Sequence, residues 1–114
     1  MDIHAILKLL NGTLVAGQLD NTTGFENAFA SDLMSDVLTV DADNTLLITG
    51  LANIQTIRTA EMSDIECIIV ARNKRATEEM IELANHSHIC IIETPFSVFR
   101  VAGLLFQYGL KPLY

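Results

Sequence analysis

Three short apolar runs recur at nearly even intervals in the second half of the chain, and a helical pattern follows each of them. The runs cover residues 45–49, 66–71 and 89–94, so their starts lie about 21 and then about 23 residues apart. Strands that alternate with helices at this spacing are typical of consecutive βαβ units, and continuous apolar strands indicate a parallel sheet covered on both faces. We therefore expect a three-layer α/β domain with a mostly parallel sheet and right-handed crossovers, formed by residues 1–114 as a single domain.

Each apolar run is followed by a residue that commonly caps a helix: Asn53, Thr77 and Thr94. Thr94 precedes Pro95, and proline is favoured in the first turn of a helix. Apolar residues at helical spacing come next in each case, and Gly109 and Pro112 are expected to end the last helix.

The first part of the chain predicts a helix capped by Asp2 and then a strand at 13–19, in which Gly17 marks a bulge or a close approach. Residues 20–24 are rich in turn formers. Alternation at 25–29 indicates a further strand, after which Asp32 is expected to cap a short helix at 33–38.

Composition excludes several classes of protein. Half of the residues are apolar, which excludes a disordered chain, and the net charge of −7 disfavours binding to nucleic acid or to an anionic membrane. The apolar stretches are far shorter than the roughly 20 residues of a membrane helix, and Met1-Asp2 opens no signal-like segment, so we expect a cytoplasmic protein.

A small domain with so much apolar content is expected to cover part of it with another chain. The last helix and the tail carry more large apolar groups than one short helix can bury inside: Phe96, Phe99, Phe106, Leu110, Leu113 and Tyr114. A homodimer is therefore predicted.

Catalytic and metal chemistry find little support in the sequence. It lacks the phosphate-loop, dinucleotide, nucleophile-elbow and zincin motifs, and no nucleophile, base and orienting group can be named together. Cys67 and Cys90 each belong to an apolar run and are interpreted as reduced core thiols. His86 and His88 fall at a helix end and in a turn, so we predict no metal site and no cofactor. The carboxylates at 32, 36, 41 and 43 match no calcium loop and are not distinguishable from a solvated acidic face.

A ligand site, if the domain has one, is expected beyond the carboxyl ends of the parallel strands. Three loops meet this condition, and their polar or close-approach residues are Thr49, Gly50, Asn53, Arg72, Asn73, Lys74, Thr94 and Ser97. Arg72, Lys74 and Arg75 concentrate positive charge in one loop of an acidic protein, which would suit a phosphate or carboxylate. The alternative is a solvated loop that only keeps the chain soluble.

The order helix, strand, turn-rich segment and three βα units resembles the DRTGG domain family. The resemblance covers nearly the whole chain and rests on Thr49-Gly50 ahead of Asn53-Ile54-Gln55, and on the closing Thr94-Pro95-Phe96-Ser97-Val98-Phe99. The family often has Asp-Arg and Thr-Gly-Gly in its loops, where this chain has Leu51-Ala52 and Ala71-Arg72-Asn73, and Ser97 stands where Asp is frequent.

The resemblance implies a fold similar to the N-terminal domain of HPr kinase/phosphorylase, without its catalytic phosphate-loop domain. DRTGG domains look like regulatory or dimerising units beside other domains. We therefore expect a non-enzymatic regulatory module that acts as a homodimer through contact with a protein partner. The alternative is a sensor for a small anion, either a nucleotide or a phosphorylated metabolite, at the carboxyl ends of the strands.

Overall fold

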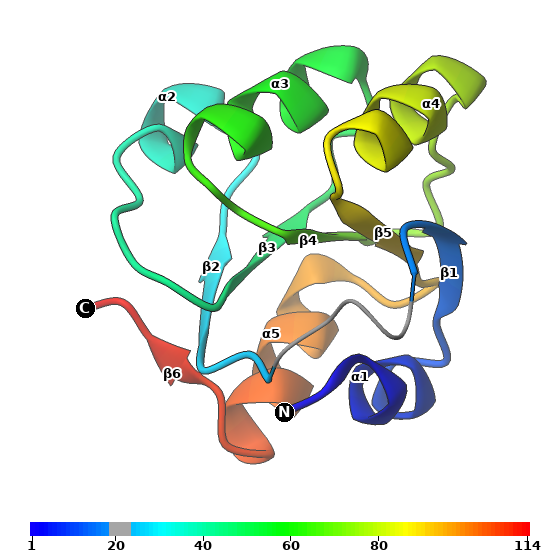
Figure 1. The fold of residues 1–114 in the computed structure, drawn as a ribbon. Helices are drawn as coiled ribbons and strands as arrows, with labels where there is room; N and C mark the ends of the chain where they lie inside the picture. The colour runs from blue at the N-terminus through cyan, green and yellow to red at the C-terminus, as the bar shows by residue number, and fades with distance from the viewer. Residues whose placement is uncertain (19–23) are drawn as a thin grey trace.

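One sheet runs through the computed structural model, which describes residues 1–18 and 24–114, and in this part of the chain it has six strands in the order β1-β5-β4-β3-β2-β6 (Figure 1). The strands are β1 (Thr13–Ala16), β2 (Asn27–Ala30), β3 (Thr45–Thr49), β4 (Cys67–Val70), β5 (Cys90–Glu93) and β6 (Lys111–Pro112). Only β1 runs antiparallel to its neighbour β5, and the other pairs of neighbours are parallel. The predicted mostly parallel α/β architecture is confirmed.

Helices cover both faces of the sheet (Figure 1). The helices α2 (Met34–Val37), α3 (Ile54–Met62) and α4 (Glu78–His86) lie on one face, whereas α1 (Ile3–Leu9) and α5 (Val98–Gln107) lie on the other. Among the described residues, no helix is long and apolar enough to cross a membrane.

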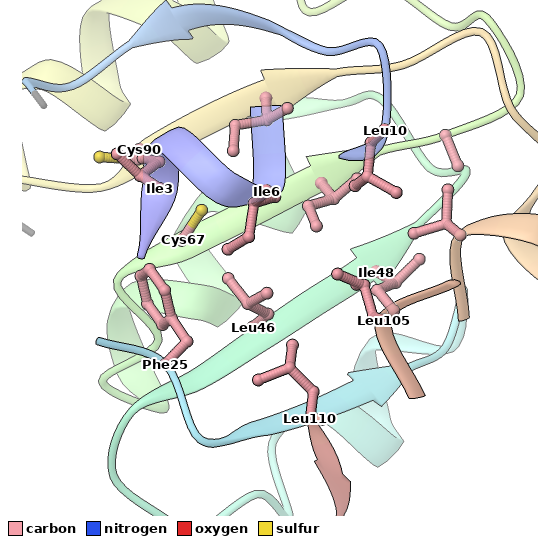
Figure 2. Packing of buried hydrophobic residues seen from close by; sticks show 14 residues of the cluster. Ile3, Ile6, Leu10, Phe25, Leu46, Ile48, Cys67, Cys90, Leu105 and Leu110 are labelled. Carbon is pink, nitrogen blue, oxygen red and sulfur yellow. The ribbon is translucent and has the colours of Figure 1, made fainter. Parts of the chain in front are cut away.

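Alternation along the strands divides the apolar residues into two cores. In β3, Leu46 and Ile48 pack toward α1 and α5, while Leu47 between them packs toward α2, α3 and α4. Figure 2 shows the first of these cores, in which Ile3, Ile6 and Leu105 lie over the central strands. Every residue of β3 and β4 is buried, which explains why these runs are continuously apolar instead of alternating.

Local capping signals place most helix starts correctly. Asp2 accepts a hydrogen bond from the Ala5 N–H at 2.9 Å, as predicted for the first helix. Asn53 and Thr77 are likewise the N-caps of α3 and α4. Side-chain oxygens at these positions satisfy N–H groups that have no partner within the helix.

The predicted cap of the last helix is wrong. Ser97, not Thr94, is the N-cap of α5, and its hydroxyl accepts a hydrogen bond from the Arg100 N–H at 3.1 Å. Thr94 still follows the line of β5, because its N–H donates to the Val70 carbonyl of β4 at 3.0 Å. Its buried hydroxyl donates instead to the carbonyl of Leu10 at 2.7 Å.

The predicted cap of the short helix is also wrong. The N-cap of α2 is Leu33, whose side chain cannot accept a hydrogen bond, and the helix is shorter than the predicted 33–38. The Asp32 carboxylate turns away from α2 toward the end of β3, where two donors are within reach.

Gly17 confirms the predicted close approach at the end of β1. Its φ is +88°, and a Cβ at this position would lie 2.5 Å from Cys90 Sγ. The predicted strand at 13–19 ends at Ala16, and the expectations for Leu19 and for most of the turn at 20–24 lie outside the described residues. Gly109, with φ +110°, follows the end of α5, whereas Pro112 belongs to β6 and does not terminate the helix.

Candidate functional site

The carboxyl ends of β3, β4 and β5 bring the three loops predicted from the sequence to one edge of the sheet. The Ala71 N–H donates to the Thr49 carbonyl at 2.9 Å, which joins the first loop to the second. The second loop meets the third through two further backbone bonds, one of which runs from the Arg72 N–H to the Phe96 carbonyl at 2.7 Å. Thr49, Arg72 and Thr94 therefore belong to one continuous surface.

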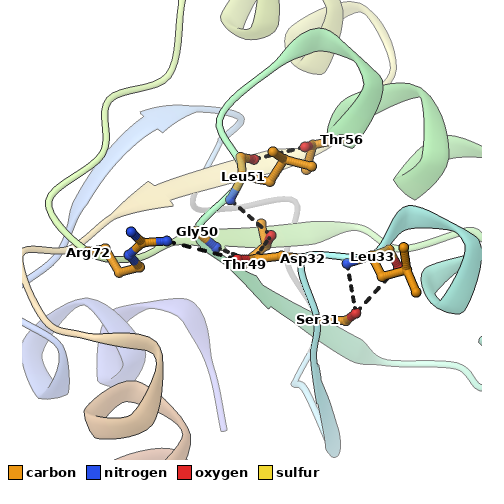
Figure 3. A network of polar contacts seen from close by, with 8 residues as sticks. All are labelled: Ser31, Asp32, Leu33, Thr49, Gly50, Leu51, Thr56 and Arg72. Atoms are coloured by element: carbon orange, nitrogen blue, oxygen red, sulfur yellow. Dashed lines mark hydrogen bonds and ion pairs between the residues drawn. The ribbon is translucent and has the colours of Figure 1, made fainter.

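Asp32, which follows β2, is the centre of the polar network at this edge (Figure 3). Its Oδ1 accepts hydrogen bonds from the Thr49 hydroxyl at 2.8 Å and from the Gly50 N–H at 2.7 Å. Its Oδ2 lies 4.0 Å from Nη1 of Arg72. The sequence analysis treated Asp32 as a helix cap. The signal that points to the site is its position directly after a fourth parallel strand, which ends at the same edge.

Gly50 allows the Arg72 side chain to lie across the β3–α3 loop. A Cβ at position 50 would lie 2.9 Å from Arg72 Cδ and 3.1 Å from its Nη1. The close approach therefore depends on the missing side chain, and it holds the guanidinium beside Asp32.

Four of the predicted site residues use their polar atoms within the fold. The Thr49 hydroxyl donates to Asp32 and accepts from the Leu51 N–H, and the Thr94 hydroxyl donates to the Leu10 carbonyl and accepts from the Phe96 N–H. Both threonines are buried. The side-chain oxygens of Asn53 and Ser97 accept from N–H groups of α3 and α5, although both residues stay exposed.

The exposed residues of the site are Arg72, Asn73 and Lys74. Arg72 and Asn73 both have left-handed backbone conformations, with φ of 65° and 58°, so the chain turns sharply after β4. Asn73 and Lys74 line a shallow pocket of about 120 Å³ next to Glu93. An amide and an ammonium group in this arrangement could bind a small anion, and the Glu93 carboxylate opposes it.

Glu93 is held in place by the same loop. Its Oε2 accepts a hydrogen bond from the Ala76 N–H at 2.7 Å, and its Oε1 lies 3.7 Å from Nη1 of Arg75. Arg75 therefore faces a carboxylate of its own chain, which leaves Lys74 as the cation of this loop best placed for a ligand.

The cysteines and histidines lie apart from this edge. Cys67 and Cys90 are free and buried, as predicted, and are partners in the register of β4 and β5. Burial raises the pKa of the Cys67 thiol well above its ordinary value, and the neighbouring Cys90 raises it further. Burial also raises the pKa of Cys90, against a lowering by the Gln18 carbonyl. His86 ends α4 and His88 follows in the turn, with φ 59°.

A search of curated proteins found no match to the chain. Among solved structures, the chain is similar to the crystal structure of the CBS and DRTGG domains of the regulatory region of Clostridium perfringens pyrophosphatase, complexed with its activator diadenosine tetraphosphate. The TM-score is 0.79 at 18% identity, over 96% of this chain and 50% of that chain. This chain therefore spans half the length of that one, and the likeness confirms the fold implied by the DRTGG resemblance.

The sequence model described as HPr Serine kinase N terminus matches residues 49–108. The match runs from the last residue of β3 to the residue after α5, so it contains the three loops of the candidate site and covers more than half of the chain. On this evidence the chain belongs to the HPr Serine kinase N terminus family and is a domain of the DRTGG type.

Proposed function

We propose that this chain is a non-enzymatic regulatory module that acts as a homodimer. The observation that carries the proposal is the outer face of α5, where Phe99 is 88% and Phe106 is 68% exposed. Exposed aromatic residues grouped on one helix of a small domain mark a surface for contact with a protein.

The polar residues at the edge of the sheet support a role without catalysis. The hydroxyls of Thr49 and Thr94 are buried and hydrogen-bonded within the fold, so neither is placed to act as a nucleophile. The raised pKa of Cys67 and Cys90 keeps both thiols protonated at neutral pH. The likeness to a regulatory region of another protein agrees with this proposal.

Sedimentation equilibrium or light scattering tests the homodimer directly. One copy has a mass of 12.5 kDa, so we expect twice this value at micromolar concentration and dissociation on dilution. A mass of one copy at every concentration up to about 100 μM, where only a very weak dimer would escape detection, would contradict the proposal.

A second candidate function is a sensor for a small anion, and the exposed Asn73–Lys74 segment favours it. Its cation lies at the carboxyl ends of the strands, where ligands of open α/β sheets bind. The class of ligand is a nucleotide or another phosphorylated metabolite. Diadenosine tetraphosphate is a natural first probe, because it is the activator bound to the regulatory region of similar fold.

Thermal shift with diadenosine tetraphosphate, ATP and inorganic phosphate tests the sensor. A ligand at 100 times its dissociation constant stabilises the folded state by about 2.7 kcal/mol, which is readily measured in a domain of this size. We expect Lys74→Glu, alone and combined with Arg72→Glu, to abolish the shift. Arg58→Glu reverses an exposed charge on α3 and serves as the matched control. A panel without any shift would reject the sensor and leave the homodimer unaffected.

A further inference from the structure

Phe99, Gly103 and Phe106 form one exposed strip along α5. They are separated by four and three residues, which at 3.6 residues per turn places them within an arc of about 60°. Both phenylalanines are mostly exposed, and Gly103 is exposed between them. The strip lies on the opposite side of the helix from Val101 and Leu105, which pack into the core.

Gly103 has no structural requirement within its own chain. A Cβ built at this position meets no atom of the described residues within 4 Å, and glycine is among the least favourable residues in a helix interior. Gly17 and Gly50, by contrast, are needed for close approaches. Gly103 leaves a notch between two exposed rings, which is the space that a second helix needs to approach closely.

An open apolar groove adjoins the strip. It has a volume of about 150 Å³ and lies between α5, β2 and β6, with Ala102 and Phe106 on its helical side and Ala30 and Pro112 on its strand side. The lining is apolar except for Lys111, so the groove suits an aromatic ring.

Charge favours a second copy of this chain as the occupant. The chain has a net charge of −7, yet residues 94–114 contain no Asp or Glu. Two copies can therefore meet through α5 without bringing carboxylates together. The guanidinium of Arg100 lies back over its own Phe96 ring, with 3.7 Å between Cζ and the ring centroid, which keeps its charge at the side of the strip.

We propose that two copies pack through this strip, with their α5 helices antiparallel and crossing at Gly103 on a two-fold axis. This inference rests on the homodimer proposed above and names its interface. In such a symmetric contact, a residue four positions before the crossing meets one three or four positions after it. Phe99 of one copy thus lies against Phe106 of the other and enters the groove beside it.

The available area matches a weak but specific dimer. At roughly 200 Å² for a full aromatic side chain, the exposed parts of Phe99, Phe106, Tyr108 and Tyr114 amount to about 600 Å² per copy. Two copies would cover about 1,200 Å², the lower limit for a stable interface. Dissociation is therefore expected in the micromolar range.

Disulfide crosslinking through Gly103→Cys tests the crossing point. A thiol on the two-fold axis meets its own symmetry copy, so mild oxidation with diamide at micromolar protein should produce a covalent dimer on a non-reducing gel. The control is Met62→Cys, which is 70% exposed on α3, on the other face of the sheet. The native cysteines are buried and contribute little background. Equal crosslinking of both variants, or none at position 103, would overturn the proposed crossing.

Sedimentation of Phe99→Asp separates the interface from the homodimer itself. The side chain is almost fully exposed, so the variant should fold, and we expect its dimer to dissociate at least tenfold more readily. Leu33→Asp changes an exposed apolar residue next to α2 and should leave the dimer unchanged. If Phe99→Asp dimerises as well as the unchanged chain, this interface is wrong and the homodimer stands. If the unchanged chain is monomeric, both proposals fail.

Discussion

Asp32 determines what the candidate anion site can bind. Its carboxylate already accepts the Gly50 N–H and lies beside Arg72, so a negative group of the protein occupies the end of β3 where a ligand anion would otherwise be attracted. An external anion must either displace Asp32 or bind farther along the loop, at Asn73 and Lys74. This is why Lys74 is the sharper test of the sensor.

Cys67 is expected to make stability depend on alkaline pH. Burial raises its pKa in the folded state above the value of about 8.5 for an unfolded thiol. The stabilising contribution is therefore complete below about pH 8.5 and is lost as pH rises through the folded-state pKa, with a slope of up to about 1.4 kcal/mol per pH unit.

The measurement is urea denaturation between about pH 8 and 10, before most Lys and Tyr side chains titrate. The free energy of unfolding should fall less steeply in Cys67→Ala than in the unchanged chain, even though the variant starts from a lower value because of its cavity. Parallel pH profiles for the two proteins would refute the prediction.

At the scale of elements, side-chain caps determine where the short helices begin. The helices α3, α4 and α5 have only 9 or 10 residues, and isolated helices of this length are marginal in water. Each begins at a residue whose side chain accepts an N–H of the first turn: Asn53, Thr77 and Ser97. Packing then holds one apolar face of each helix against the sheet.

Ser97→Ala is expected to lower the free energy of unfolding by about 1 kcal/mol, because the Arg100 N–H loses its acceptor. Pro95→Ala changes an exposed residue that lies before the cap, and we expect an effect of less than about 0.5 kcal/mol. Urea denaturation of the two variants compares them directly. A larger loss in Pro95→Ala would mean that the helix begins earlier than the structure indicates.

At the scale of the whole molecule, Thr94 joins the first helix to the last parallel strand. Its hydroxyl donates to the carbonyl of Leu10, 84 residues away in the chain, and both residues are buried. The bond ties the end of α1 to the edge of the sheet where the three loops meet. The layer formed by α1 and α5 is thereby connected to the candidate site.

Thr94→Val removes this hydroxyl with little change of shape. The buried Leu10 carbonyl would lose its donor and the Phe96 N–H would lose its acceptor, so we expect a loss of about 1–3 kcal/mol in the free energy of unfolding. Thr39→Val is the control, because the hydroxyl of the exposed Thr39 bonds only locally, to the Asp36 carbonyl. Equal losses in the two variants would show that the long-range bond is not special.

The sequence by itself determined the features that depend on near neighbours. The buried strands at 45–49, 66–71 and 89–94 are visible as apolar runs, and Asn53 and Thr77 are visible as caps because a cap bonds an N–H only three residues away. The parallel order of β3, β4 and β5 followed from the helices between them, and it predicted correctly that their loops meet at one edge.

Only the tertiary structure decided which polar groups at that edge are available. Asp32 and Thr49 bond across 17 residues, and Thr94 and Leu10 across 84, and no periodic pattern connects residues so far apart. The same holds for α5, where helical spacing identifies the apolar residues but only packing shows that Phe99 and Phe106 remain uncovered. The physical reason is that hydrogen bonds within a turn depend on the local backbone, whereas contacts between distant segments depend on how the layers pack.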